Sequence, residues 1–386
     1  MGNKRNKIIP IQRMAKKVVP TISRELDVEV VGIERIRKIY GNNVSSYLIK
    51  TAKKEGESNT FFLKFIFDSS VKREVSGTNE LGKFLFTPKI VKFRNGKFTN
   101  KWILFKNIEG SLMGEYLDNG IDDKQFSHFL LLEKNKEKQL VNLYEKASKK
   151  LINSREYGKI YANKLYGDRL WGERYDNYYE KDNTISRYFD HQIRINGRVL
   201  PRKVSTVVES IKGKYAKMSG LSGHVTGFLS HGDAHHGNII ISKNKKICFI
   251  DSEYWGYLPV FMELAKPYYN DFLGNLFFHG HDDLDSCFSI KKEEEDSNKH
   301  LSFSISVSKD RLKQRLLITE EKIKNRARII GDNKDFLDLG DYLIMSHMLT
   351  KNPFFYPPKI RKLFLIFCLI LFDFDYKKPS SIYQYF

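Results

Sequence analysis

Short stretches rich in β-branched and aromatic residues recur through the first hundred residues, separated by more polar segments. Such stretches predict strands, and here they cover residues 28–33, 45–51, 60–67 and 102–105. A stretch of helical character, residues 71–84, lies between the last two. We therefore expect about five strands and one helix in this part of the chain.

From Leu112 onward apolar residues recur at intervals of three and four, which predicts helices with one face in a core. Two short strands, residues 226–230 and 246–250, interrupt these helices. The two clearest helical faces consist of Leu140, Val141, Leu143, Tyr144, Ala147 and Leu151, and of Val204, Val207, Val208, Ile211 and Tyr215.

Further along the chain, Leu301, Phe303, Ile305 and Val307 alternate with serines and predict another strand. We expect it to pair with residues 287–290 as a hairpin, across the charged run KKEEED at 291–296 that we interpret as a solvated loop. Helices are expected from there to the C-terminus. The longest apolar run, residues 363–372, is about half of the roughly 20 residues needed to cross a bilayer. It therefore indicates a buried helix, and no membrane span is expected.

These patterns predict an α+β chain with a small β-rich N-terminal lobe and a larger, mainly helical C-terminal lobe. At 386 residues the chain exceeds the usual size of a single core, which also favours two lobes. The cysteines Cys248, Cys287 and Cys368 form no CxxC pair, which argues against a disulfide framework or a thiolate zinc site. This usage, and an N-terminus without an apolar signal-like run, favour a cytoplasmic location.

The formal net charge of +20 is unevenly distributed. Residues 1–100 hold 21 Lys and Arg against 9 Asp and Glu, whereas residues 251–300 hold 4 against 11. A basic first quarter attracts any polyanion, whether nucleic acid, an anionic membrane or a nucleotide triphosphate. Charge alone does not choose among them, although no RRM, zinc-finger or helix-turn-helix signature supports a specific nucleic-acid partner.

The densest group of reactive side chains is HGDAHHGN at residues 231–238. One interpretation is a zinc cage, but the order HxDxHH differs from the HxHxDH of metallo-β-lactamase-type hydrolases, and beyond His279 and His281 no compact set of histidines follows to complete a site. The other is phosphoryl transfer, which needs a carboxylate to accept the hydroxyl proton and an amide oxygen to hold magnesium. In that interpretation Asp233 is the base and Asn238 a metal ligand.

The stretch ICFIDSEYWG begins with an apolar predicted strand, and this strand ends at Asp251, thirteen residues after Asn238. A carboxylate at a strand end of this kind can hold the ions that bridge the β- and γ-phosphates. Together, HGDAHHGN and FIDSE resemble the aminoglycoside phosphotransferase and choline kinase family, whose members are small-molecule kinases with a protein-kinase-like fold. The resemblance extends from about Ile33 to at least Leu264.

The resemblance implies roles for residues of the N-terminal lobe. FFLKFI places Lys64 on a strand where the fold keeps a phosphate-binding lysine, and Glu74 on the next helix is its expected ion-pair partner. Around the nucleotide we expect Gly41, Asn42 and Asn43, helped by Ser45 or Ser46, and Lys106 and Ile108 in a hinge beside the adenine. The implied domains are 1–105 as N-lobe, with residues 1–24 as a basic extension, 106–110 as hinge and 111–386 as C-lobe.

The sequence departs from the family at two places. The turn YGNNVSSYLIKT has one glycine rather than the GxGxxG of protein kinases, and Ser252 stands where the family has a bulky aromatic residue after the metal aspartate, which could loosen packing. Supporting roles are assigned to His231, His236 and Glu253.

Each assignment has an ordinary structural alternative. Lys64 could be a solvent-facing strand lysine, Glu80 is a rival for Glu74, and the histidines could be structural. Glu253 touches a second metal or simply ends the strand. The aromatic residues Trp171, Tyr175, Tyr178 and Tyr179 are more typical of a core than of a substrate platform.

The expected function is ATP-dependent transfer of the γ-phosphoryl group to a hydroxyl of a small molecule, with Mg²⁺ as cofactor and GTP as the alternative nucleotide. The acceptor stays open among aminoglycosides, choline-like amino alcohols and sugars. The acidic residues Glu263, Asp271, Asp282, Asp283 and Asp285 could favour a cationic amine. A nucleotide-binding pseudokinase scaffold and a His/Asp metallohydrolase are the alternatives, and the sequence does not indicate an oligomeric state.

Overall fold

The computed structural model describes residues 16–36, 46–52, 60–66, 71–96, 101–118, 122–153, 186–220, 224–258, 263, 271, 288–330, 370 and 378–386. Contacts divide the chain into two compact units. Unit 1 is Met1–Tyr116 with His231–Gly256, and unit 2 is Leu117–Ser230 with Tyr257–Phe386. The segment 231–256 thus belongs with the first unit, although it follows more than a hundred residues of the second. The lobe and hinge boundaries expected from the sequence stay predictions.

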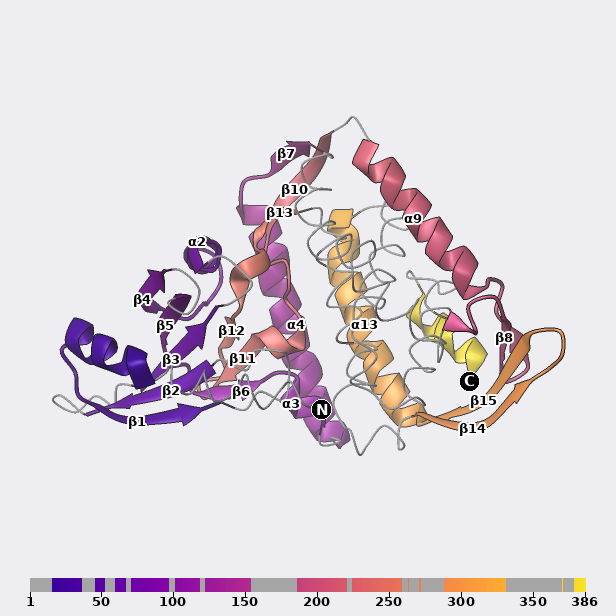
Figure 1. Ribbon diagram of the computed structural model, residues 1–386, viewed down its shortest axis with the longest axis horizontal. Coiled ribbons are helices and arrows are strands. Elements are labelled where there is room, and N and C mark those ends of the chain that lie inside the picture. Colours follow the sequence, from indigo (N-terminus) through magenta and orange to yellow (C-terminus); the bar gives the residue numbers. More distant parts are fainter. Residues whose placement is uncertain are drawn as a thin grey trace. The chain divides into compact units, whose positions relative to one another are not determined.

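Unit 1 contains a five-stranded antiparallel sheet in the order β1–β2–β3–β5–β4 (Figure 1). All four expected strands are present, with boundaries shifted by a few residues at most, and β4 is the fifth. The strands are β1 Val30–Arg35, β2 Ser46–Thr51, β3 Thr60–Phe65, β4 Ile90–Asn95 and β5 Lys101–Lys106.

The two faces of this sheet are covered differently. On one face Val18 and Ile22, from helical residues 16–26, are buried with apolar side chains of β2, β3 and β5. On the other face Val71 and Val75 of helix α2, Val71–Leu81, pack with Ile103 and Phe105 of β5. Val18 and Ile22, which lie in the basic extension expected from the sequence, are thus part of the core of unit 1.

A second, three-stranded sheet of unit 1 carries the HGDAHHGN segment. It has the order β12–β11–β6, with β6 Gly110–Leu112, β11 Ile239–Ser242 and β12 Ile247–Phe249. A Cβ on Gly110 would lie 2.1 Å from the Ile241 carbonyl oxygen, so the close approach of β6 to β11 requires glycine there. Short 3-10 turns, His236–Asn238 and Ser252–Tyr254, precede β11 and follow β12.

Unit 2 is built on long helices. These are α4 Asp123–Lys146, α9 Val204–Gly220 and α13 Lys309–Ile330, with a 3-10 turn, Pro379–Tyr385, near the end. The short α3 Glu115–Asp118, before α4, spans the boundary between the two units. The Asp122 side chain accepts from the Gln125 backbone N–H, and the Gln125 side chain accepts from the Asp122 N–H, which fixes the start of α4. Both predicted helical faces are buried where the structure describes them, except at Leu151.

Leu151 is a correction to the predicted helix. Helix α4 ends at Lys146, and Leu151 is 74% exposed on β7 Lys150–Asn153. β7 pairs with β10 His224–Ser230 in a sheet of order β13–β10–β7, with β13 Gly256–Leu258. Pairing with a strand more than seventy residues away in sequence overrides the local periodicity.

The charged run at 291–296 is also not a loop. The expected hairpin is confirmed, but β14 Phe288–Glu295 continues through the charged residues to pair with β15 His300–Val307, and the turn lies at Asp296–Lys299. The charged side chains are exposed, so the strand presents them to solvent. With β8 Gln192–Ile195 and β9 Arg198–Val199 the hairpin forms a four-stranded sheet in the order β14–β15–β8–β9.

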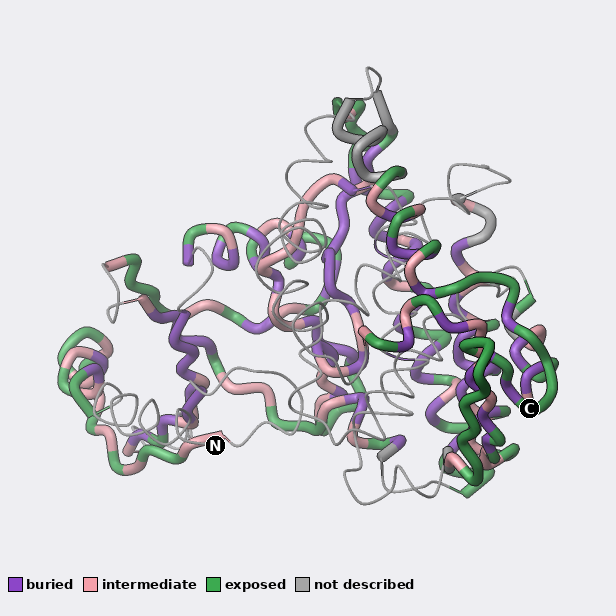
Figure 2. Tube along the Cα trace, turned by 45° about the vertical axis from the view of Figure 1, so that its right-hand side comes forward, coloured by how far each residue is buried: buried purple, intermediate pink, exposed green. Residues whose placement is uncertain are grey.

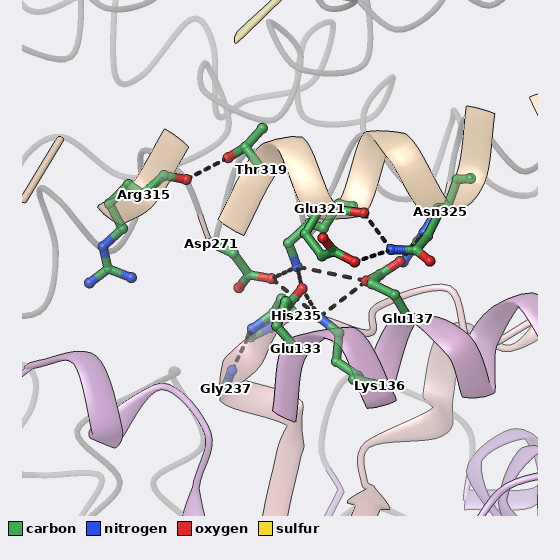
Figure 3. A network of polar contacts seen from close by, with 12 residues as sticks. Glu133, Lys136, Glu137, His235, Gly237, Asp271, Arg315, Thr319, Glu321 and Asn325 are labelled. Atoms are coloured by element: carbon green, nitrogen blue, oxygen red, sulfur yellow. Dashed lines mark hydrogen bonds and ion pairs between the residues drawn. The ribbon is translucent and has the colours of Figure 1, made fainter. Parts of the chain in front are cut away.

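A buried ion-pair network connects α4 and α13 within unit 2. Lys322 Nζ lies 2.7 Å from both Glu133 Oε1 and Asp271 Oδ2, and Arg326 Nε lies 2.7 Å from Glu137 Oε2. Figure 3 shows Glu133 and Glu137 projecting from α4 toward α13, with Asp271 beside them. Because all of these side chains are at most 1% exposed, each charge depends on its partners for stabilisation.

The fold class expected from the sequence is confirmed: a small β-rich unit accompanies a larger, mainly helical one. Buried residues run through the central strands β3 and β5, whereas the outer turns of the helices are exposed (Figure 2). Among the described helices, none combines the length and apolar character that crossing a membrane requires. The apolar run 363–372 lies outside the described residues except for Ile370, which is helical and buried.

Candidate functional site

Lys64 on β3 and Glu74 on α2 form a buried ion pair in unit 1. Lys64 Nζ lies 2.9 Å from Glu74 Oε1 and 2.8 Å from Oε2, so the ammonium contacts both carboxylate oxygens. Lys64 is 5% exposed and Glu74 1% exposed. The rival Glu80 pairs instead with Lys83 on the exposed side of the same helix, so the structure brings Lys64 together with Glu74.

Asp251 is the second partner of the same lysine. Lys64 Nζ lies 2.8 Å from Asp251 Oδ1, which connects β3 to the end of β12, 187 positions away in sequence. Asp251 has a left-handed backbone, with φ 63° and ψ 55°, which turns the chain from the strand into the 3-10 turn. Aspartate tolerates this conformation better than most residues with a side chain. The turn leaves the Asp251 carboxylate beside the lysine.

Burial and neighbouring charges have opposite effects on the pKa values of Lys64 and Glu74. Burial disfavours the charge of Lys64, but Asp251, Glu74 and Glu253 outweigh that effect and hold its pKa well above the usual value. Burial raises the pKa of Glu74 to about 7; Lys64 partly offsets the effect, and Asp251 adds to it. Lys64 therefore stays charged, while Glu74 titrates in the neutral range.

The HGDAHHGN segment is attached to the end of β12 by His231 and Gly232. The His231 ring nitrogen Nδ1 accepts from the Asp233 backbone N–H at 3.3 Å, so Nε2 carries the proton and donates to the Ile250 carbonyl at 3.0 Å. Gly232 has φ 82°, and a Cβ there would lie 2.1 Å from the Tyr254 carbonyl oxygen. His231 thus has a structural position that fixes the loop beside residue 250.

Asp233 and Asn238 are held close together by the loop backbone. The Asn238 side-chain amide donates to the Asp233 backbone carbonyl at 3.0 Å. The backbone carbonyl of Asn238 accepts from the Ile250 N–H, also at 3.0 Å. Both residues are buried. The second bond joins Asn238 to the residue that precedes Asp251. A backbone hydrogen bond therefore joins the loop to the strand end that carries Asp251.

The histidines do not assemble a metal cage in the described part of the chain. His235 Nδ1 accepts from the Gly237 N–H at 3.0 Å, and its Nε2 lies 3.6 Å from Asp233 Oδ1. His279 and His281 lie outside the described residues. Among the residues the structure describes, the group whose ligand atoms lie within 4.8 Å of one another is Glu74, Asp251 and Glu253, which contains no imidazole.

This donor set is suited to a hard cation. Carboxylate and amide oxygens are the ligands that Mg²⁺ prefers, whereas zinc sites are dominated by nitrogen and sulfur. Asp251 contributes a carboxylate and Asn238 an amide on the neighbouring loop, with Glu253 two residues further along. Asp251 also contacts Lys64, so a cation held by Asp251 would share this carboxylate with the lysine.

The remaining predicted site residues are only partly described. Gly41, Asn42, Asn43 and Ser45 lie outside the described residues, as do Trp171, Tyr175, Tyr178 and Tyr179. Ser46 is buried on β2 and pairs in register with Lys64. Lys106 ends β5 with an exposed side chain, and its backbone N–H donates to the Lys89 carbonyl at 2.8 Å. Ile108 is half-buried in the segment that follows.

The proposed acidic surface for a cationic acceptor is corrected at two positions. Glu263 and Asp271 are 0% and 1% exposed and are bonded to Tyr144 and Lys322 within unit 2. Their charge is used inside the unit and is not displayed to a substrate. Asp282, Asp283 and Asp285 lie outside the described residues.

Sequence reasoning missed the polar contacts behind the ion pairs. Ser252, expected to loosen packing, is 2% exposed, and its hydroxyl lies 2.8 Å from Thr78 Oγ1 on α2. Trp255 Nε1 donates to the Arg73 carbonyl at 2.9 Å. Hydrogen bonds thus replace the apolar contact that an aromatic residue would make. The position of Thr78, one helical turn after Glu74, was the available signal.

No protein-family model and no curated protein matches this chain. Similar solved structures include choline kinase LicA from Streptococcus pneumoniae, at 14% identity over 87% of this chain and 99% of that one, with TM-score 0.41. Another is the aminoglycoside phosphotransferase APH(4)-Ia, at 8% identity over 96% of this chain and 99% of that one, with TM-score 0.48. A third is a Plasmodium vivax ethanolamine kinase, at 14% identity over 99% of this chain and 88% of that one, with TM-score 0.44.

These neighbours are small-molecule kinases. At 8–14% identity and TM-scores below 0.5 they assign neither a family nor a substrate, and we base the functional proposal on this chain's own side chains.

Proposed function

We propose that this protein is a small-molecule kinase that transfers the γ-phosphoryl group of ATP to an alcohol. The observation that carries the proposal is the simultaneous contact of Lys64 Nζ with Glu74 and Asp251, in the same unit as the loop that bears Asp233 and Asn238. A buried lysine braced by one carboxylate, with a second carboxylate placed to hold magnesium, is an arrangement that protein kinases use for phosphoryl transfer. GTP is the alternative donor.

In the proposed reaction the chain acts mainly by positioning and by electrostatics. Lys64 places a fixed positive charge at the triphosphate, and Glu74 fixes the direction of that ammonium. Asp233 orients the acceptor hydroxyl and removes its proton as the oxygen attacks phosphorus. Asn238 and Asp251 would hold magnesium, with Glu253 as an additional ligand; the ion would neutralise the phosphate oxygens. The loop bonds from Asn238 keep Asp233 oriented before substrate arrives.

The acceptor belongs to the same proposal. Aminoglycosides, choline-like or ethanolamine-like amino alcohols and sugars are the candidate classes. They can be separated by measuring ADP release from ATP or GTP with Mg²⁺ and each compound in turn. A compound that raises ADP release above the rate with nucleotide alone is an acceptor.

Substitution Asp233→Asn tests the role of the base. The amide keeps the side-chain shape but cannot accept the hydroxyl proton, so turnover should fall by about 10²- to 10⁴-fold. Nucleotide binding, measured by calorimetry, should be retained. Asp123→Asn, an exposed aspartate at the start of α4, is the matched control and should keep full turnover. Unchanged turnover in Asp233→Asn would refute the assignment, and nucleotide binding without ADP release for any acceptor would indicate a pseudokinase.

A further inference from the structure

Three oxygens form a closed polar group behind the Lys64 ion pairs in unit 1. Thr78 Oγ1 lies 2.8 Å from Ser252 Oγ and 2.9 Å from the Glu74 carbonyl oxygen, and Ser252 Oγ lies 3.2 Å from that same carbonyl. Thr78 and Ser252 are 5% and 2% exposed. The two hydroxyls have two protons between them, so the group can satisfy the carbonyl and one hydroxyl–hydroxyl bond at the same time.

The positions of these residues give the group its significance. Thr78 lies four residues after Glu74, on the same face of α2, and Ser252 directly follows Asp251. The Thr78 hydroxyl therefore lies one helical turn from Glu74, and the Ser252 hydroxyl lies one residue after Asp251. Glu74 and Asp251 are the two carboxylate partners of Lys64. Movement of α2 against residue 252 would separate the two carboxylates that hold the lysine.

The backbone around the pair is packed too closely to slide freely. A Cβ on Gly77 would lie 2.3 Å from Trp255 Cδ1 and 2.5 Å from the Ser252 carbonyl oxygen, so glycine lets α2 approach this segment. The Trp255 indole donates to the Arg73 carbonyl one turn before Gly77. Both contacts involve α2 residues just before Thr78 and oppose sliding of the helix along residues 252–255.

We propose that Thr78 and Ser252 are a positioning pair that holds Glu74 and Asp251 on Lys64 before nucleotide binds. This inference goes beyond the proposed function because it assigns a role to two residues to which that function gives none. The pair acts through the carboxylates. Its loss should loosen the lysine while the sheet itself remains folded.

The test compares Thr78→Val, which keeps the side-chain shape and removes the hydroxyl, with Thr78→Ser, which keeps the hydroxyl. The readout is the rate at which an amine-reactive anhydride modifies Lys64, followed by peptide mass spectrometry. We expect Thr78→Val to raise this rate about fivefold, the change typical of one lost hydrogen bond, and Thr78→Ser to restore the slow rate. The exposed Lys243 should react equally in all variants.

A double-substitution cycle separates positioning from a general loss of stability. If the hydroxyls act as a pair, Thr78→Val combined with Ser252→Ala should change Lys64 reactivity no more than either substitution alone. If Thr78→Val does not fold, as judged by circular dichroism, Ser252→Ala alone provides the same readout. Unchanged Lys64 reactivity in a folded variant, or additive effects in the double variant, would overturn the proposal.

Nucleotide binding, measured on the same samples, distinguishes this inference from the proposed function. If the unaltered protein binds no ATP or GTP, the kinase proposal fails. The rate of Lys64 modification still shows whether Thr78 and Ser252 act as a positioning pair. If it binds nucleotide, Thr78→Val should weaken nucleotide binding while Thr78→Ser retains it.

Discussion

Glu74 combines deep burial with two contacts to one ammonium group, and this combination gives the residue a distinctive titration. Its carboxyl is almost free of solvent, and its pKa is raised to about 7 chiefly by burial. A group whose pKa is higher in the folded chain than in the unfolded chain binds its proton more tightly when folded. Protonation therefore favours the folded state between the usual carboxyl pKa and about 7.

This titration predicts a pH dependence of stability. As pH rises from about 5 to 8, the free energy of unfolding should fall more in the unaltered protein than in Glu74→Gln, because only the carboxyl releases a proton in this range. Urea unfolding at several pH values measures the difference. Glu80→Gln, an exposed glutamate on the same helix, should keep the slope of the unaltered protein. Equal slopes for all three proteins would contradict the raised pKa.

At this scale the spacing of two motifs predicted Asp233, Asn238 and Asp251 as candidates, and the family resemblance implied Lys64 and Glu74. The sequence could not predict that Lys64 contacts Asp251 directly, because the two residues are 187 positions apart. The same holds for Thr78 and Ser252. Hydroxyl groups are common on exposed surfaces, and only the packing of α2 against the 3-10 turn makes these two interact.

At the scale of elements, glycines show where two segments must approach closely. Gly77 lies in α2 against Trp255, whereas Gly213 lies in α9 with no atom within 4 Å of the place its Cβ would occupy. Both are interior helical positions, where alanine is intrinsically favoured over glycine by about 1 kcal/mol. The two sites therefore isolate the effect of packing from the effect of helix propensity.

We expect opposite outcomes for the two matched alanine substitutions. Gly213→Ala should raise the melting temperature slightly because the new methyl group meets open space. Gly77→Ala should lower it, since the methyl group would push α2 away from Ser252 and Trp255. Thermal unfolding followed by circular dichroism measures both. A Gly77→Ala protein as stable as Gly213→Ala would show that α2 can move without cost.

The elements predicted from periodicity were mostly present, and the errors have a common cause. Leu151 left its predicted helix because β7 pairs with β10, and the charged run at 291–295 became strand because β15 supplies a partner for its backbone. In both places distant hydrogen-bonding partners decided the structure. Local hydrophobic pattern contains no information about such partners.

At the scale of the whole molecule, the buried ion pairs of unit 2 show how much of its charge is internal. Lys322 contacts Glu133 and Asp271, and Arg326 contacts Glu137. Figure 3 shows these three carboxylates close together. Replacing one member of such a network leaves its partners charged and without compensation, which costs more than the network contributes when intact. Composition gives no indication of this arrangement, because acidic and basic residues are counted alike wherever they lie.

Substitution of Lys322 tests this network. Lys322→Met preserves the length of the side chain but leaves Glu133 and Asp271 with one cation fewer, so the free energy of unfolding should fall by about 3–5 kcal/mol. Lys324→Met, on the exposed side of α13, is the control and should change stability by less than about 0.5 kcal/mol. Urea denaturation provides both values. A Lys322→Met protein as stable as the control would mean that the buried carboxylates are already neutral.

Unit 1 is completed by a segment that is synthesised late. A ribosome that has just added Ser230 has produced Lys64 and Glu74 but neither Asp233 nor Asp251, and it has meanwhile made the whole of Leu117–Ser230. Lys64 therefore has no Asp251 partner until residue 251 is made. The backbone hydrogen bond between Ile250 and Asn238 also forms only after this segment is complete. Prematurely terminated chains that end before residue 231 would carry an incomplete unit 1, in which Lys64 and Glu74 are present but Asp251 is missing.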